Sequence, residues 1–208
     1  MSVSIGDPAP DFSLDDIDGI PTTLTEHRGR KVMLSFYRSA DCPFCNYAVD
    51  VLQGNHKKLA WAANLDVIII FQSTTEAIDN FIFKSRRTTK NRYPFTVLAD
   101  PDQMAFKKYT VTEQSQGPFR DLLREYKETR EYNKYIKKYS LQNEIDKQTY
   151  QYLLLTDFLI DENGIIVDCF RSKASTKHIP MRRIKHFLCH GEKKETKLSL
   201  ISKLKNVC

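Results

Sequence analysis

Short apolar runs alternate along the chain with longer stretches in which apolar residues recur at helical spacing. The run at 66–72 is nearly continuous in apolar β-branched residues, as in a central strand that is buried on both faces. A second strand is predicted at 31–37, followed by a helix over 43–63. Further strands are predicted at 11–14 (an edge strand), 94–101, 157–161 and 165–171, and further helices at 75–86, 102–109 and 180–188. This order predicts an α/β protein with a mixed central sheet and helices on both faces.

Residues 112–150 interrupt this alternation. They carry many charges and repeated tyrosines, and their apolar residues recur at helical spacing. We expect a helical insertion, made of one long or two shorter helices, that packs its tyrosine face on the domain. A lid or an oligomer interface are the alternatives. The predicted organisation is therefore a single domain over 1–190 that includes this insertion, followed by a basic tail over 191–208.

Composition narrows the class of protein. A chain of 208 residues is long enough for one domain with a substantial core. The net charge of +6 is modest for this size, and acidic residues are interleaved with the basic ones, so no nucleic-acid partner is expected. No apolar stretch approaches the ~20 residues that a transmembrane helix needs, so no membrane partner is expected either. The first residues lack the basic and apolar regions of a signal peptide, and the expected compartment is the cytoplasm.

The candidate chemistry lies directly after the strand at 31–37, where Cys42 and Cys45 form a C-x-x-C motif at the expected start of a helix. In a cytosolic protein this placement predicts redox chemistry. Two thiols on one helical turn can close a disulfide with little backbone movement, and the helix start favours thiolate over thiol by roughly one pKa unit. Arg38 could add to that effect and Asp41 would oppose it. Asp41 is also the expected N-cap, with Pro43 in the first turn.

Four segments together point to a family. They are residues 5–14 (IGDPAPDFSL), 36–38 (FYR) ahead of 42–45 (CPFC), 98–101 (LADP) and 157–164 (DFLIDENG). The chain resembles the alkyl hydroperoxide reductase and thiol-specific antioxidant (AhpC/TSA) family, in its peroxiredoxin-like branch, over about residues 3–111 and 153–188.

The resemblance implies a thioredoxin-like fold and a thiol-dependent oxidoreductase with antioxidant activity. Its site would be Cys42 and Cys45, which are oxidised reversibly, together with Arg38. It implies a small peroxide or a protein disulfide as oxidant and a thiol reductant such as a thioredoxin or glutathione system. No cofactor is implied, and a homodimer is possible.

The chain also departs from the family pattern. A peroxiredoxin presents P-x-x-x-T-x-x-C and a remote arginine around the peroxide. Aligning the aromatic pair places Arg38 at the proline, Cys42 at the threonine, Cys45 at the peroxidatic cysteine and Leu155 near the arginine. The cis-proline that thioredoxin-like oxidoreductases carry near Leu155 is absent as well.

Two mechanisms therefore remain open. In dithiol exchange, Cys42 would form the mixed disulfide and Cys45 would resolve it. In a peroxidase, Cys45 would be oxidised to sulfenic acid and Cys42 would condense with it. Without the threonine and the arginine such a peroxidase should be slow, and Arg38 is the residue that could compensate.

Other roles for the polar and sulfur-containing residues are alternatives. The protein could be a dithiol–disulfide exchange protein without significant peroxidase activity, or a metal-binding or interaction module in which His178 joins the cysteine pair. For His178 we favour capping or packing at the final helix. The spacing of the remaining cysteines and histidines forms no zinc-finger pattern. Cys169 is expected to be an inert buried residue in a strand, and Cys189 and Cys208 to be incidental thiols.

Overall fold

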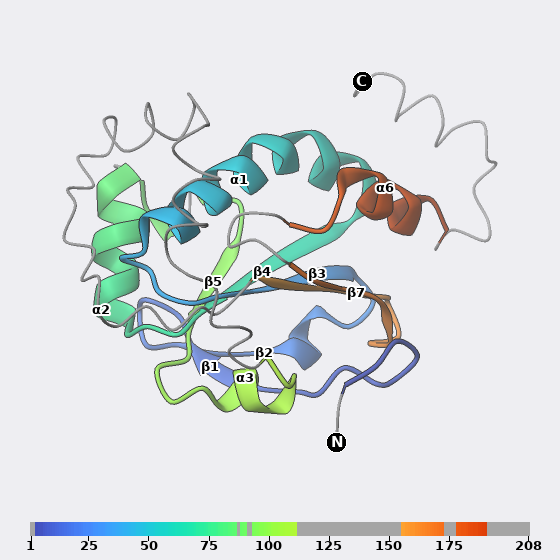
Figure 1. Ribbon diagram of the computed structural model, residues 1–208, viewed down its shortest axis with the longest axis horizontal. Helices are drawn as coiled ribbons and strands as arrows, with labels where there is room; N and C mark the ends of the chain where they lie inside the picture. The colour runs from blue at the N-terminus through green and yellow to red at the C-terminus, as the bar shows by residue number, and fades with distance from the viewer. Residues whose placement is uncertain (1–2, 87, 91–92, 112–154, 173–177, 191–208) are drawn as a thin grey trace.

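The computed structural model describes residues 3–86, 88–90, 93–111, 155–172 and 178–190. The predicted insertion at 112–150, the predicted tail at 191–208 and Cys208 lie outside these described residues. Within them, a seven-stranded mixed sheet carries helices on both faces, as predicted (Figure 1).

The strands of this sheet are arranged in the order β2-β1-β5-β4-β3-β6-β7. The three central strands β3, β4 and β5 are parallel, while β6 runs antiparallel to β3, β7 to β6, and β1 to both β2 and β5. The strand bounds are β1 (Ser13–Asp15), β2 (Pro21–Thr23), β3 (Lys31–Tyr37), β4 (Leu65–Phe71), β5 (Thr96–Ala99), β6 (Thr156–Ile160) and β7 (Ile166–Arg171).

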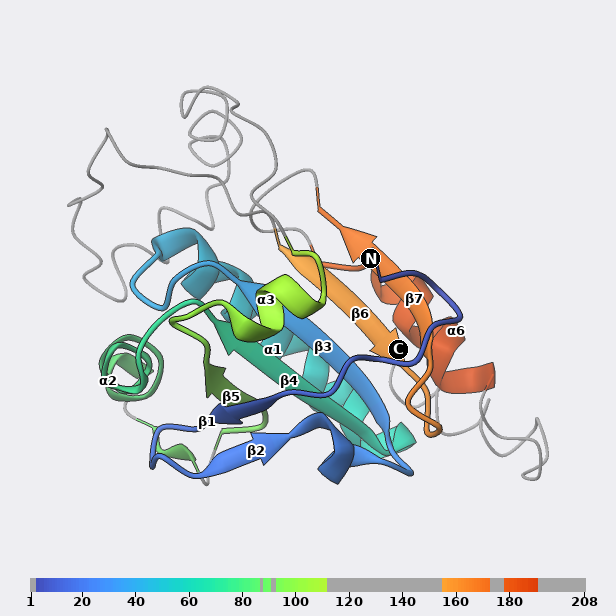
Figure 2. The ribbon, with the colours of Figure 1, turned by 90° about the horizontal axis from the view of Figure 1, so that it is seen from below.

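Helices cover the sheet unequally. The helices are α1 (Pro43–Ala63), α2 (Thr75–Ile78), which continues as the π-helical turn η2 (Asp79–Phe83) and the 3₁₀ turn η3 (Lys84–Arg86), α3 (Met104–Lys108) and α6 (Met181–His190), with the 3₁₀ turn η1 (Leu24–His27) before β3. The apolar side chains of α1, α2 and α6 pack on one face of the sheet, and those of α3 pack on the other (Figures 1 and 2).

The central strands are apolar on both faces because each face has its own core. Along β4, Ile69 and Phe71 join the cluster under α1, while Ile68 and Ile70 join the cluster under α3. The nearly continuous apolar run at 66–72 follows from this burial on both sides.

Residues 11–14 were predicted as an edge strand, and this prediction was wrong. The strand β1 lies between β2 and β5, and the edge is formed by β2, which the sequence pattern did not indicate. β2 has three residues, and its burial pattern shows no buried apolar position. Its strand character comes from pairing with β1, with Thr23 opposite Ser13, and its first residue is Pro21, a residue tolerated at sheet edges.

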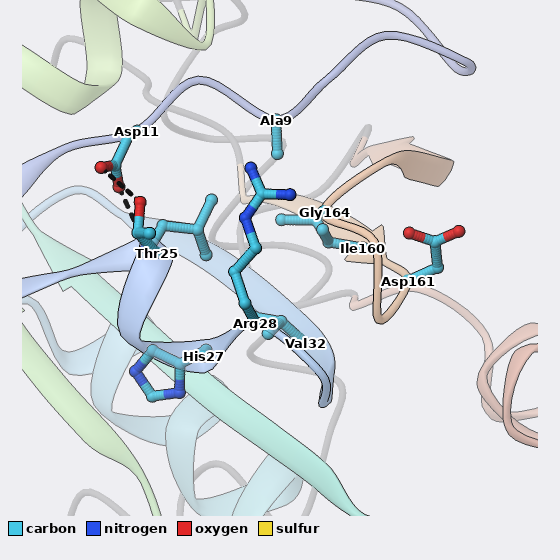
Figure 3. Close-up of a pocket in the computed structure, with 10 residues that line it drawn as sticks. Ala9, Asp11, Thr25, His27, Arg28, Val32, Ile160, Asp161 and Gly164 are labelled. Atoms are coloured by element: carbon cyan, nitrogen blue, oxygen red, sulfur yellow. Dashed lines mark hydrogen bonds between the residues drawn. The ribbon is translucent and has the colours of Figure 1, made fainter.

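The turn between β6 and β7 is held from outside by Arg28. Gly164 adopts a φ of +78°, and the Arg28 guanidinium lies against it and donates a hydrogen bond to the Asn163 carbonyl (Figure 3). The cavity beside Arg28 measures about 20 Å³, room for one water molecule and not for a ligand.

No helix in the described part of the chain is both long and apolar enough to cross a bilayer.

Candidate redox site

The cysteine pair lies where β3 passes into α1. β3 ends at Tyr37, a loop follows over 38–41, and Cys42 is the last residue before the helix, with extended backbone angles (φ −66°, ψ 119°). Pro43 occupies the first helical turn, as predicted. A proline fits there because its missing N–H has no partner in an α-helix anyway.

Asp41 was predicted as the N-cap, and this prediction was wrong. The N-cap residue is Cys42, and no side-chain hydrogen bond caps the helix. Asp41 lies one position too early in the chain, and its carboxylate accepts a hydrogen bond from the Ser39 hydroxyl instead. The carboxylate therefore accepts a hydrogen bond within the loop rather than capping the N–H groups of α1.

Asn46 holds this loop from inside the helix, a role that the sequence did not indicate. Its side chain is buried and donates to the Ala40 carbonyl at 2.5 Å and to the Cys42 carbonyl at 3.1 Å. The Ala40 N–H donates to the Ser73 hydroxyl at 3.0 Å, which ties the loop to the end of β4. In the sequence, the position of Asn46 directly after the second cysteine was the signal that could have indicated this role.

Neither Cys42 nor Cys45 forms a disulfide, and both thiols are nearly inaccessible, with Cys42 5% and Cys45 3% exposed. A hydrogen bond between Cys45 and Cys42, together with burial, raises the pKa of Cys45 well above its ordinary value. The Ser39 N–H and the positive charge of Arg38 act in the opposite direction and lower the pKa of Cys45, but they do not outweigh these effects. The pair therefore loses its two protons in separate steps, the second at high pH.

Arg38 is half-buried in the loop after β3. Its charge acts on the pKa of Cys45, so the structure brings Arg38 into electrostatic range of the cysteine pair. The three residues predicted as the site thus lie together at one end of β3.

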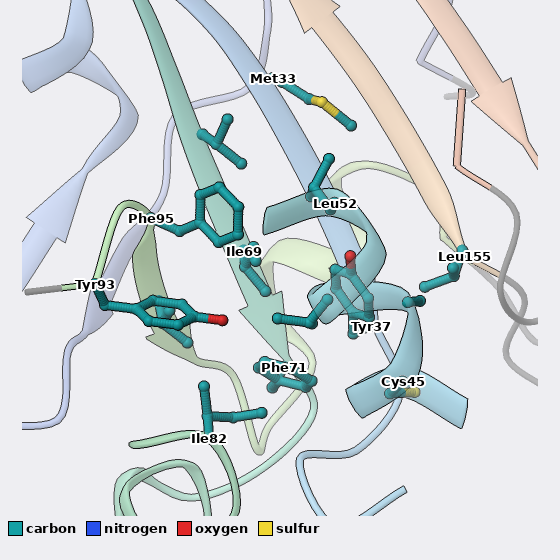
Figure 4. Packing of buried hydrophobic residues seen from close by; sticks show 14 of the residues in the cluster. Met33, Tyr37, Cys45, Leu52, Ile69, Phe71, Ile82, Tyr93, Phe95 and Leu155 are labelled. Atoms are coloured by element: carbon teal, nitrogen blue, oxygen red, sulfur yellow. The ribbon is translucent and has the colours of Figure 1, made fainter. Parts of the chain in front are cut away.

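Leu155 belongs to the same apolar cluster as Cys42 and Cys45 (Figure 4). It is buried and directly precedes β6, at the position that aligns with the family's remote arginine. Every peptide bond among the described residues is trans. An aliphatic side chain of this cluster therefore stands at the position where a cation or a cis-proline would be expected.

His178 is not part of a metal site in the described residues. Its ring nitrogens lie 2.6 Å from the Tyr37 hydroxyl oxygen, 3.2 Å from the Ala48 carbonyl oxygen and 3.1 Å from an Asp157 carboxylate oxygen. No group of three potential metal-ligating residues occurs among the described residues. We had favoured capping or packing at the final helix for His178, whereas these contacts are with β3, α1 and β6.

The remaining described cysteines lie apart from the pair. Cys169 is in β7 as predicted, but its side chain is half-buried rather than fully buried, and burial raises the pKa of its thiol. Cys189 is exposed on α6. Neither forms a disulfide in this structure.

The sheet, the flanking helices and a C-x-x-C at the start of α1 define a protein of thioredoxin-like fold with a thiol pair at the first turn of α1. The family model of the AhpC/TSA family matches residues 5–169, and the chain belongs to this family.

Two bacterial relatives illustrate the sequence similarity. The chain is 33% identical over 106 residues to peroxiredoxin Bcp of Escherichia coli (strain K12), which covers 51% of this chain and 64% of that protein. It is 28% identical over 168 residues to a Coxiella burnetii protein named putative peroxiredoxin bcp, covering 80% of this chain and 87% of that one. The chain thus matches slightly less than two thirds of the Escherichia coli protein's length.

Solved structures show the same fold. Peroxidoxin BcpB from Mycobacterium tuberculosis superposes with a TM-score of 0.57 at 17% identity, over 99% of both chains. The thiol peroxidase from Chromobacterium violaceum gives a TM-score of 0.62 at 13% identity, over 93% of this chain and 90% of that one. At these identities the comparison concerns the fold alone.

Proposed function

We propose that this protein is a thiol-dependent oxidoreductase of the peroxiredoxin type, which reduces small peroxides through reversible oxidation of Cys42 and Cys45. The observation that carries the proposal is the pair of reduced cysteines whose side chains are in hydrogen-bond contact at the start of α1. Membership of the AhpC/TSA family and the relatives named peroxiredoxin support the same chemistry.

In the first step Cys45 attacks the peroxide. Its sulfur takes one oxygen atom, the O–O bond breaks, and the products are a sulfenic acid on Cys45 and an alcohol or water. The Ser39 N–H and the charge of Arg38 stabilise the Cys45 thiolate that attacks. Burial and the Cys42 contact keep the thiolate fraction small, so we expect a slow peroxidase.

In the second step the thiol of Cys42 condenses with the sulfenic acid. A Cys42–Cys45 disulfide forms and water leaves. Two successive exchanges with a thiol reductant, such as a thioredoxin or glutathione system, return both cysteines to thiols. This cycle needs a reducing compartment, such as the cytoplasm.

Dithiol–disulfide exchange is a second candidate function, and the raised pKa of Cys45 favours it. Because Cys45 keeps its proton more tightly, Cys42 would carry the first negative charge of the pair. That distribution suits a mechanism in which Cys42 attacks a disulfide and Cys45 resolves the intermediate.

Stopped-flow oxidation by hydrogen peroxide, followed by mass spectrometry, tests the proposal on wild type, Cys42→Ser and Cys45→Ser. We expect an intramolecular disulfide in the wild type, a dimedone-trapped sulfenic acid on Cys45 in Cys42→Ser, and no fast oxidation in Cys45→Ser. A Cys169→Ser, Cys189→Ser double variant serves as the control and should behave like the wild type.

The peroxidase proposal fails if neither thiol reacts faster than free cysteine and no disulfide forms. Reduction of a model disulfide by the same protein, lost in Cys42→Ser, would then favour exchange. A homodimer remains a prediction, which sedimentation velocity of the reduced and oxidised protein would check.

A further inference from the structure

A chain of buried polar groups lies under the N-terminal half of α1. Ser35, Tyr37 and Asp157 are fully buried, and the side chain of His178 is 9% exposed. The Ser35 hydroxyl donates to Asp157 at 2.7 Å, the Ile179 N–H donates to its other carboxylate oxygen at 2.7 Å, and His178 Nδ1 lies 3.1 Å from the same carboxylate. These groups come from β3, β6 and the segment before α6.

The hydrogen bonds decide where the proton of His178 lies. Both carboxylate oxygens of Asp157 already accept from groups that can only donate to them, so the imidazole nitrogen facing them, Nδ1, carries a hydrogen. The other nitrogen, Nε2, faces the Tyr37 hydroxyl at 2.6 Å and the Ala48 carbonyl at 3.2 Å.

Nε2 therefore has one partner for each protonation state of the ring. A neutral His178 accepts the hydrogen of the Tyr37 hydroxyl at Nε2, and the Ala48 carbonyl then receives no hydrogen from the ring. A protonated His178 donates to the Ala48 carbonyl or to the Tyr37 oxygen, because a carbonyl can only accept. Only a protonated His178 can therefore donate a hydrogen bond to α1, at the Ala48 carbonyl.

Both partners of Nε2 adjoin the redox site. Tyr37 is the residue before Arg38 and belongs to the apolar cluster that contains both cysteines (Figure 4). Ala48 is three residues after Cys45, less than one helical turn away. His178 consequently contacts both β3 and α1, the two elements that the loop before the cysteine pair connects.

We propose that His178 is a positioning residue for the thiol pair. Through the Tyr37 hydroxyl and the Ala48 carbonyl it fixes the first turns of α1 against β3 and β6, and its protonation state adjusts the reactivity of Cys42 and Cys45. For the catalytic cycle this inference rests on the proposed function, but the effect on thiol reactivity does not require peroxide.

Other titratable groups around the network are few among the described residues. Asp157 faces His178 from β6 and Tyr37 faces it from β3. The charge of Asp157 also acts on the pKa of Cys169 in β7 and of Arg183 in α6. The test therefore compares substitutions of network residues with the substitution of a histidine outside the network.

Alkylation of Cys42 and Cys45 by iodoacetamide, measured site by site from pH 5.5 to 9 on the reduced full chain, tests the proposal. The proposal predicts that the shape of this profile depends on His178, whose ring contacts both β3 and α1. In His178→Gln the shape of the profile should change and the rate at pH 7 should differ from the wild-type rate about threefold or more, because glutamine cannot change its charge.

Tyr37→Phe is the second variant, chosen to retain the fold if His178→Gln does not. Its profile should also differ from that of the wild type, because one of the two partners of Nε2 is gone. His186→Gln, an exposed histidine on α6, is the matched control and should leave the profile unchanged.

Profiles of identical shape in wild type, His178→Gln and Tyr37→Phe would overturn the proposal, even if the variants melt at lower temperature, because a purely structural role moves only stability. A shifted profile in a protein that hydrogen peroxide does not oxidise would support the positioning role while refuting the peroxidase. The two failures are thereby distinguishable.

Discussion

Asn46 shows how one buried side chain shapes the redox loop. An amide buried without partners is costly, and this one satisfies its donors on the carbonyls of Ala40 and Cys42. Its own N–H also bonds the Cys42 carbonyl, at 3.0 Å. Asn46 thus fixes the backbone immediately before the helix, where the first thiol is attached.

Asn46→Ala should lower the free energy of unfolding by about 1–3 kcal/mol, since the Ala40 carbonyl loses its side-chain donor and the Cys42 carbonyl keeps only the backbone N–H of residue 46. The matched control is Asn55→Ala on the same helix, where an exposed amide donates to the Val51 carbonyl and the cost should stay within about 0.5 kcal/mol. Urea unfolding of the reduced proteins measures both values. Equal costs in the two variants would contradict a special role for Asn46.

Two glycines illustrate how the same residue serves different elements. Gly164 closes the β6–β7 turn at φ +78°, and a Cβ there would meet the Arg28 guanidinium at 3.0 Å. Gly54 lies inside α1, where a Cβ would meet nothing within 4 Å. The turn needs the left-handed backbone, whereas the helix only loses conformational entropy by containing a glycine.

Replacement by alanine should therefore have opposite signs at the two sites. Gly164→Ala should destabilise the protein by about 1 kcal/mol or more, because alanine is strained at positive φ. Gly54→Ala should stabilise it by about 0.5–1 kcal/mol, the usual gain for alanine in a helix interior. Thermal unfolding followed by circular dichroism gives both signs, and a stabilising Gly164→Ala would disprove the account of the turn.

Ionisable groups link distant parts of the whole domain. Burial raises the pKa of Asp66, but hydrogen bonds from His27 and Arg30 outweigh it, and the net pKa is lowered. Asp11 and Asp16 follow the same balance and also have lowered pKa values. The pKa of Cys45 is shifted in the other direction, above its ordinary value.

These opposite shifts predict a stability maximum between about pH 5 and 8. The depressed carboxylates stabilise the fold above their unfolded pKa of about 3.9, and this contribution is lost as the pH falls through their folded values. Cys45, whose pKa is raised by folding, stabilises the fold below its unfolded pKa of about 8.5. This stabilisation is lost as the pH rises through the pKa of Cys45 in the folded protein.

Urea unfolding from pH 2.5 to 10 measures this curve. Asp66→Asn should flatten the acid limb, and Cys45→Ser the alkaline limb. Asp102→Asn, an exposed carboxylate after β5, should change neither limb. An unchanged acid limb in Asp66→Asn would show that the contacts with His27 and Arg30 do not couple to folding.

Local patterns in the sequence were sufficient for the elements whose signals are local. The strand at 31–37 and the helix at 43–63 have the predicted bounds, because apolar periodicity and a proline in the first turn lie within the segments themselves. The placement of the cysteine pair at the strand–helix junction follows directly from these two elements.

Long-range contacts decided the rest. β2 exists as a strand because β1 pairs with it. Cys42 rather than Asp41 is the N-cap of α1, and the Asp41 carboxylate bonds within the preceding loop. The bonds from Ser35 to Asp157 and between Tyr37 and His178 join residues 122 and 141 positions apart. Since local periodicity carries no information on such distant partners, only the tertiary structure could place this buried network beneath the thiols.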